Sequence, residues 1–128
     1  MVIDTSAIIA ILTDEPIRPE LNRKIEADPT RLMSSGTMLE TAIVIESRRG
    51  VEGGRVLDLF LHTAEVEIVP PTEEHITLAR RAYRQFGEGN HSASLNFGDC
   101  FAYALAKASG EPLLCTGDDF AKTGLPLC

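Results

Sequence analysis

Several features that mark common protein classes are absent from this sequence. It has no apolar run of the roughly 18 residues that a membrane-spanning helix needs, and its N-terminus lacks the basic segment and cleavage site of a secretory signal. Its three cysteines, Cys100, Cys115 and Cys128, form no CxxC pair and have no histidines at a spacing suited to zinc. We therefore expect reduced thiols and a cytoplasmic location.

Positive charge is also scarce. The chain has 12 Lys and Arg against 19 Asp and Glu, which gives a formal net charge of −7. A nucleic-acid-binding protein normally presents a basic face to the phosphates, so this balance counts against such a function. Net charge is a sum, however, and a divalent cation would offset carboxylates gathered at one site. The composition therefore weakens a nucleic-acid hypothesis without excluding it.

The length and composition fit one compact domain. The 128 residues can enclose a core but are too few for two ordinary domains, and 44% apolar and 24% charged residues are near the average of globular proteins. No internal repeat, low-complexity tract or linker interrupts the chain. We expect a single domain over residues 1–128.

Short apolar segments alternate with amphipathic ones along the chain. The predicted strands are VID (2–4), RLMSS (31–35), VEIVPP (66–71) and PLLCTGDDF (112–120). The predicted helices cover residues 7–12, 19–28, 37–50, about 54–65, 72–86 and 98–110, with a cap at Ser35 or Thr37 and a polar loop over 87–96. Strands separated by helices predict an α/β fold with a mostly parallel sheet and helices on both of its faces.

Acidic residues follow the first and the last of these strands. Asp4 comes directly after Val2 and Ile3, and Asp118 and Asp119 come after PLLCTG. In an open α/β sheet, ligands bind at the carboxyl ends of the strands, so these carboxylates can meet. Each also has a structural alternative, because Asp4 could simply cap a helix and the two later acids could form a turn.

Two further acids lie near helix starts. Asp99 follows Gly98 where one helix begins, and Glu40 lies in the first turns of an apolar helix. Alone, Asp99 could be a cap and Glu40 a solvated residue at a helix boundary. No Lys or Arg lies within six residues of Asp4, Glu40 or Asp99. We infer that Mg²⁺ or Mn²⁺, which prefer oxygen ligands, supplies the missing positive charge.

Other catalytic signatures are missing. The three histidines are scattered, Ser6 has no His and acid in a triad pattern, and neither a nucleophile elbow nor a P-loop occurs. Four arginines are candidates for binding RNA phosphates, although each could equally be solvated helix surface. They are Arg48, Arg49, Arg80 and Arg84. The last two share a helix face because they are four residues apart.

Four segments carry a resemblance to a known family: VIDTSA, MLETAIVIE, NFGDCFAYALAKASGEPLL and TGDDF. In this order they resemble the PIN-domain ribonucleases, and specifically the VapC toxins of bacterial toxin–antitoxin pairs. The resemblance implies a PIN-like three-layer α/β sandwich around a mostly parallel sheet of four to five short strands. It implies catalytic carboxylates at Asp4, Glu40, Asp99 and Asp118, which with Asp119 hold Mg²⁺ or Mn²⁺. It further implies supporting hydroxyls at Thr5, Ser6 and Thr116.

The resemblance also implies a function and partners. The expected activity is metal-dependent endoribonuclease cleavage of tRNA or rRNA, which inhibits translation. The expected partners are a second copy of the chain and a VapB-like antitoxin whose C-terminal segment blocks the site, in a higher assembly. An alternative is an acidic groove that binds a basic peptide without turnover, which the net charge favours. A nuclease acting on DNA flaps is a third hypothesis, but the chain is short for the DNA-gripping elements it would need.

Overall fold

The computed structural model describes residues 1–89 and 91–128, so Asn90 of the expected polar loop lies outside the described residues. Within them, four short parallel strands form one sheet in the order β3-β2-β1-β4. The strands are β1 (Val2–Ile3), β2 (Leu32–Ser34), β3 (Glu67–Val69) and β4 (Leu113–Leu114). All four predicted strand segments are confirmed, although each strand is shorter than its apolar segment.

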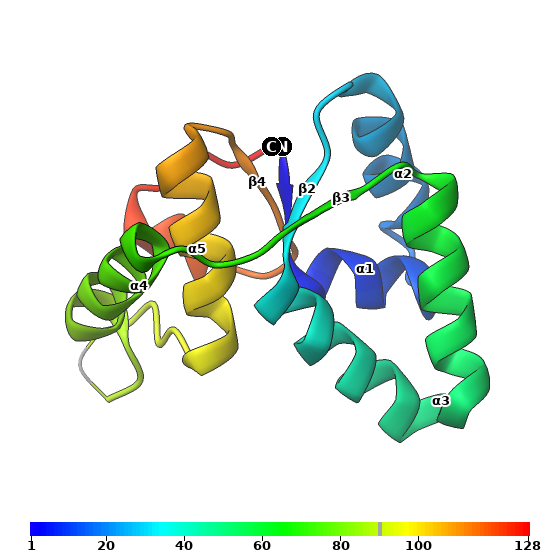
Figure 1. The fold of residues 1–128 in the computed structure, drawn as a ribbon, viewed down its shortest axis with the longest axis horizontal. Coiled ribbons are helices and arrows are strands. Elements are labelled where there is room, and N and C mark those ends of the chain that lie inside the picture. Colours follow the sequence, from blue (N-terminus) through cyan, green and yellow to red (C-terminus); the bar gives the residue numbers. More distant parts are fainter. Residues whose placement is uncertain (90) are drawn as a thin grey trace.

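Helices cover both faces of this sheet (Figure 1). On one side lie α1 (Thr5–Leu12), α2 (Arg18–Ala27) and α3 (Ser35–Thr63), and on the other lie α4 (Glu73–Phe86) and α5 (Phe97–Ser109). A short 3₁₀ helix, η1 (Phe120–Thr123), follows β4. This arrangement confirms the predicted three-layer α/β fold. No helix in the described part of the chain is long and apolar enough to cross a membrane.

The strands divide the apolar core into two parts. Ile3 and Leu114 belong to the cluster that includes α1, α2 and α3, whereas Val2 and Leu113 belong to the cluster that includes α4 and α5. This division follows because successive side chains of a strand point to opposite faces of the sheet. Two residues in β1 and two in β4 are therefore enough to contact both helical layers.

The long helix α3 is interrupted at Gly50. The backbone there has φ 66° and ψ −163°, which is not helical and which glycine adopts without a steric penalty. The predicted helix end at Gly50 is therefore confirmed, but the next helical segment resumes at once rather than near Gly54. The predicted caps, Ser35 or Thr37, were wrong, because Ser34 caps this helix: its hydroxyl accepts a hydrogen bond from the Gly36 N–H.

The sheet order brings two parts of the predicted site together, namely the residue after β1 and the loop after β4. β1 pairs directly with β4, with Val2 opposite Leu113 and Ile3 opposite Leu114. The Asp4 N–H then donates to the carbonyl of Leu114 over 3.0 Å. Because both strands run in the same direction, Asp4 and the loop after β4 leave the sheet side by side.

Candidate active site

Asp4 serves as a helix cap with one oxygen and leaves the other free. Its Oδ2 accepts hydrogen bonds from the N–H of Ser6 (3.0 Å) and from the Ser6 hydroxyl (2.7 Å), which caps α1. Its Oδ1 is buried and has no hydrogen-bond partner among the described residues. Burial raises the pKa of Asp4, and the negative charge of Glu40 raises it further, although the Ser6 hydrogen bonds oppose this.

Ser6 also connects this corner to the end of β4. Its hydroxyl oxygen accepts a hydrogen bond from the Thr116 N–H over 3.0 Å. One hydroxyl thus donates to Asp4 and accepts from the loop that carries Asp118 and Asp119. The supporting role proposed for Ser6 has a structural basis, whereas for Thr116 the contact involves its backbone rather than its hydroxyl.

Glu40 is held between α1 and the start of α5. The Thr5 hydroxyl donates to Glu40 Oε1 over 2.7 Å. On the other side, the Glu40 carboxylate fills the space where a side chain at Gly98 would begin, since an added Cβ would lie 1.9 Å from Oε2. Glycine at this position therefore allows the N-terminus of α5 to approach Glu40.

Asp99 takes part in a reciprocal cap at the start of α5. Its Oδ2 accepts a hydrogen bond from the Asn96 N–H (3.0 Å), and the Asn96 side chain accepts one from the Asp99 N–H (2.9 Å). Burial raises the pKa of Asp99 to about 6, and the charges of Asp4, Glu40 and Asp119 contribute to the rise. The negative charges of these neighbouring carboxylates therefore oppose the ionisation of Asp99.

Three of the predicted acids line one cleft of about 340 Å³. They are Asp4, Glu40 and Asp99. The predicted supporting residues Thr5, Ser6 and Thr116 line the same cleft. Asp118 and Asp119 are exposed on the loop after β4 and do not line it. Of these two, Asp119 is close enough for its charge to affect the pKa of Asp99.

The chemistry of this cleft fits a hard divalent cation. Its acidic donors are carboxylate oxygens, and Asp4 contributes an oxygen that is buried and unpaired. The described residues contain no group of three or more His, Cys, Asp or Glu side chains already close enough to form a complete metal site. Mg²⁺ is compatible with this arrangement because proteins commonly hold it through one or two carboxylates, with water and phosphate oxygens completing the shell.

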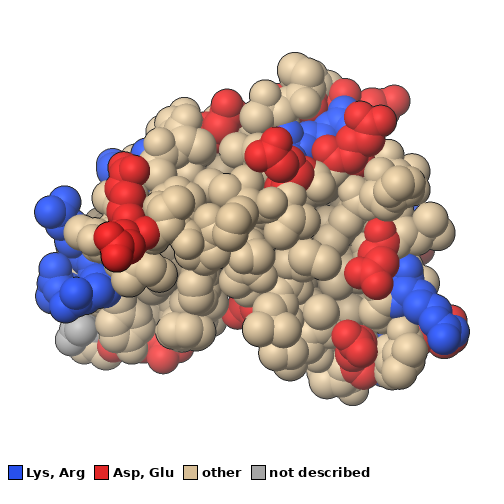
Figure 2. Space-filling view, viewed as in Figure 1, with Lys and Arg blue, Asp and Glu red and all other residues tan. Residues whose placement is uncertain are grey.

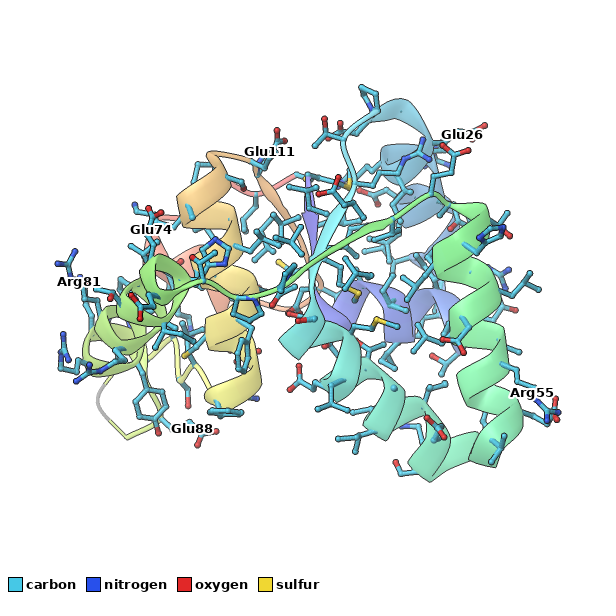
Figure 3. All side chains as sticks on the ribbon, viewed as in Figure 1. Glu26, Arg55, Glu74, Arg81, Glu88 and Glu111 are labelled. Carbon is cyan, nitrogen blue, oxygen red and sulfur yellow. The ribbon has the colours of Figure 1, made fainter. Side chains whose placement is uncertain are left out.

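The four candidate arginines lie in different places. Arg48 is the one cationic side chain that lines the cleft among the described residues. Arg49 instead donates to the carbonyl of Leu12 over 2.9 Å, which ties α3 to the end of α1. Arg80 and Arg84 line a separate groove between α4 and α5. Figure 2 shows basic side chains gathered at the edge over α4, and Figure 3 shows Arg81 there projecting outward.

Sequence reasoning missed two residues that shape the site. Asn96 was not considered, although an Asn three residues before an Asp at a helix start is a capping-box pattern. Thr41 was also missed, because a threonine inside an apolar helix gives no signal until the fold shows which hydroxyl it contacts.

Comparisons with known proteins identify the family. A family model described as PIN domain matches residues 1–125. The chain belongs to the PIN-domain family. Within that family it is 57% identical over 123 residues to a protein named Ribonuclease VapC from Mycolicibacterium smegmatis, an alignment that covers 96% of this chain and 95% of that protein. This PIN-domain chain is therefore a member of the VapC group.

Solved structures agree with the PIN-domain fold. VapC20 of Mycobacterium tuberculosis, described as a toxin that cleaves the sarcin–ricin loop, superposes with a TM-score of 0.78 at 17% identity over 97% of this chain and 95% of that one. A chain from a toxin–antitoxin complex of Klebsiella pneumoniae gives a TM-score of 0.71 at 18% identity, covering 96% and 92%. At these identities the likeness establishes the fold alone.

Proposed function

We propose that this PIN-domain chain is a metal-dependent endoribonuclease and the toxin of a cytoplasmic toxin–antitoxin pair, acting as one domain over residues 1–128. The observation that carries the proposal is the cleft that Asp4 shares with Glu40 and Asp99, with a buried oxygen on Asp4 that is unpaired among the described residues. The 57% identity of this chain to a Ribonuclease VapC supports it. The proposed substrate class is tRNA or rRNA, with inhibition of translation as the outcome, and cleavage of the sarcin–ricin loop by VapC20, which has the same fold, supports rRNA within this class.

The proposed cation is Mg²⁺ or Mn²⁺, held by Asp4, Glu40 and Asp99. When bound, such a cation would activate water for attack on the phosphodiester and stabilise the charge that develops. Thr5 keeps Glu40 in place through its 2.7 Å hydrogen bond, and the cap with Asn96 fixes the rotamer of Asp99. The last loop would supply a fourth carboxylate from Asp118 or Asp119, and Asp119 is the one whose charge contributes to the raised pKa of Asp99.

The RNA backbone would be bound by arginines around the cleft. Arg48 is placed to contact a phosphate next to the acids, since it lines the same cleft. Arg80 and Arg84 are on the α4 side, where they would contact phosphates farther along the RNA strand. Arg49 contributes less to this surface because its guanidinium already donates to the Leu12 carbonyl.

The proposed protein partners are a VapB-like antitoxin and a second copy of the chain. The Klebsiella chain comes from a toxin–antitoxin complex, which supports the first, and a basic side chain of the antitoxin would complement the acidic cleft. For the second copy we propose the apolar face around Phe97, which is 78% exposed and lies beside a groove of about 380 Å³ that the exposed side chains of Leu39 and Ile43 also line. A projecting ring beside a hollow can pair with itself across a two-fold axis.

The test is turnover by purified, antitoxin-free protein. Structured RNA incubated with Mn²⁺ should be cut by the wild type, and cleavage should be lost in EDTA and in Asp99→Asn. Cleavage that persists in both conditions would refute the metal-dependent scheme. RNA left intact by the wild type, together with tight binding of a basic peptide, would favour the acidic-groove binding module instead.

A further inference from the structure

A buried chain of hydroxyl groups continues behind the Thr5–Glu40 hydrogen bond. Thr41 follows Glu40 in α3 and is fully buried. Its Oγ1 lies 2.9 Å from Thr5 Oγ1 and 2.8 Å from the carbonyl oxygen of Thr37. Thr41 does not line the cleft, and among the described residues its side chain is linked to the site by the hydrogen bond with Thr5.

The single proton on each hydroxyl fixes the direction of this chain. An ionised carboxylate only accepts hydrogen bonds, so the 2.7 Å contact between Thr5 and Glu40 uses the proton of Thr5. Thr5 can then only accept from Thr41. Hydrogen bonds linked in this way polarise one another, so a donor behind Thr5 strengthens its bond to Glu40.

Thr41 also affects the second hydrogen-bond acceptor that the Thr5 hydroxyl can reach. The carbonyl oxygen of Thr37 lies 3.4 Å from Thr5 Oγ1 and is a second acceptor for its proton. When Thr41 donates to Thr5, the hydroxyl is oriented toward Glu40. When Thr41 instead donates to the Thr37 carbonyl, it uses one of the two lone pairs of this competing acceptor. The first arrangement favours the rotamer in which Thr5 holds Glu40, and the second makes the competing acceptor less available to Thr5.

We infer that Thr41 is a positioning residue for Glu40, acting through Thr5 to fix the carboxylate that faces the proposed cation. This inference rests on the proposed function, because it assigns Glu40 a role in binding the metal. Removing a group that orients a metal ligand typically weakens metal affinity by roughly 10- to 100-fold. Thr41→Val should therefore weaken Mn²⁺ binding while keeping the size and shape of the side chain.

The chain offers a matched control one turn earlier in the same helix. Thr37 is also fully buried, but its hydroxyl has no hydrogen-bond partner among the described residues. Thr37→Val makes the same chemical change without touching Glu40. Thr41→Ser keeps the hydroxyl at the original position and should restore binding.

The experiment is calorimetric titration of Mn²⁺ into purified, antitoxin-free protein, with melting curves to verify folding. We expect roughly 10-fold weaker Mn²⁺ binding in Thr41→Val and near wild-type binding in Thr41→Ser and Thr37→Val. On a Glu40→Gln background, Thr41→Val should have no further effect, because the carboxylate through which Thr41 acts has been removed.

Three results would overturn the inference. Wild-type affinity in Thr41→Val, with weakened binding in Glu40→Gln, would remove Thr41 from the site and leave the proposed function intact. Equal losses in Thr41→Val and Thr37→Val would show a general effect of buried threonines. Unchanged affinity in Glu40→Gln would refute the role of Glu40 in metal binding, and the role of Thr41 would fall with it.

Discussion

Replacing Gly98 by alanine should separate the stability of the fold from the activity of the site. A Cβ at this position would lie 1.9 Å from Glu40 Oε2 and 2.3 Å from its Cδ, far inside van der Waals contact. The clashing atoms are the end of a flexible side chain, so Glu40 can rotate away while the helices stay in place. Its rotation would break the 2.7 Å hydrogen bond from Thr5.

The magnitudes for Gly98→Ala oppose each other. Alanine inside a helix is more favourable than glycine by about 0.5–1 kcal/mol, while losing a hydrogen bond to a charged group costs about 1.5–3 kcal/mol. The net change in the free energy of unfolding should therefore be modest, about 0.5–2.5 kcal/mol of destabilisation. Displacing Glu40, the carboxylate proposed to bind the metal, should reduce kcat/KM for RNA by at least roughly 10- to 100-fold.

Gly54 provides the control for this substitution. It is also a helical glycine whose missing Cβ faces a glutamate, with Glu46 Cδ 3.0 Å away, but it does not line the cleft. Gly54→Ala should leave RNA cleavage unchanged and should not lower the melting temperature by more than Gly98→Ala does. Full cleavage activity in Gly98→Ala would refute the role given to the close approach of α5 and Glu40.

Three further predictions follow from the charges and the exposed surface. The pKa of Asp99 is raised to about 6, so the folded state binds the proton of this carboxyl more tightly than the unfolded state does. In EDTA, the free energy of unfolding should therefore fall as pH rises from about 4 to about 6. Melting curves of Asp99→Asn should lack this pH dependence. Asp119→Asn should weaken Mn²⁺ binding more than Asp118→Asn, and the reverse order in a titration would favour Asp118 as the fourth carboxylate. Phe97→Asp should convert a dimer into monomers in sedimentation velocity, whereas Val51→Asp, at an apolar and 64% exposed position on a different helix, α3, should not.

The fold was largely predictable from the sequence because its signals are local. Glycine ended the first segment of α3, prolines followed β3, and apolar runs marked the central strands. The position of Asp4 could also be predicted, because a residue that follows the first strand of an α/β sheet lies at the ligand-binding edge. The pairing of β1 with β4 then brought the last loop beside it.

The details of the site were less accessible because they depend on contacts across the chain. The hydrogen bond between Thr5 and Glu40 joins residues 35 positions apart, and the space for Glu40 is made by Gly98 on another helix. The choice between Asp118 and Asp119 depends on how the loop turns after β4. Residue types and spacing carry no information about such distances, so the sequence left both acids as candidates.

A helix cap and a metal ligand were alternative interpretations of Asp4 in the sequence, but one carboxylate can serve both roles. Its Oδ2 satisfies the start of α1, and this bond fixes the side chain so that Oδ1 stays buried and unpaired. Asparagine can still accept the capping hydrogen bond but carries no charge. Asp4→Asn should therefore raise the melting temperature in EDTA while abolishing RNA cleavage, because the charge that burial and Glu40 disfavour is the charge a cation would require. A lower melting temperature in EDTA would show that the carboxylate is needed for capping itself, and the separation of the two roles would fail.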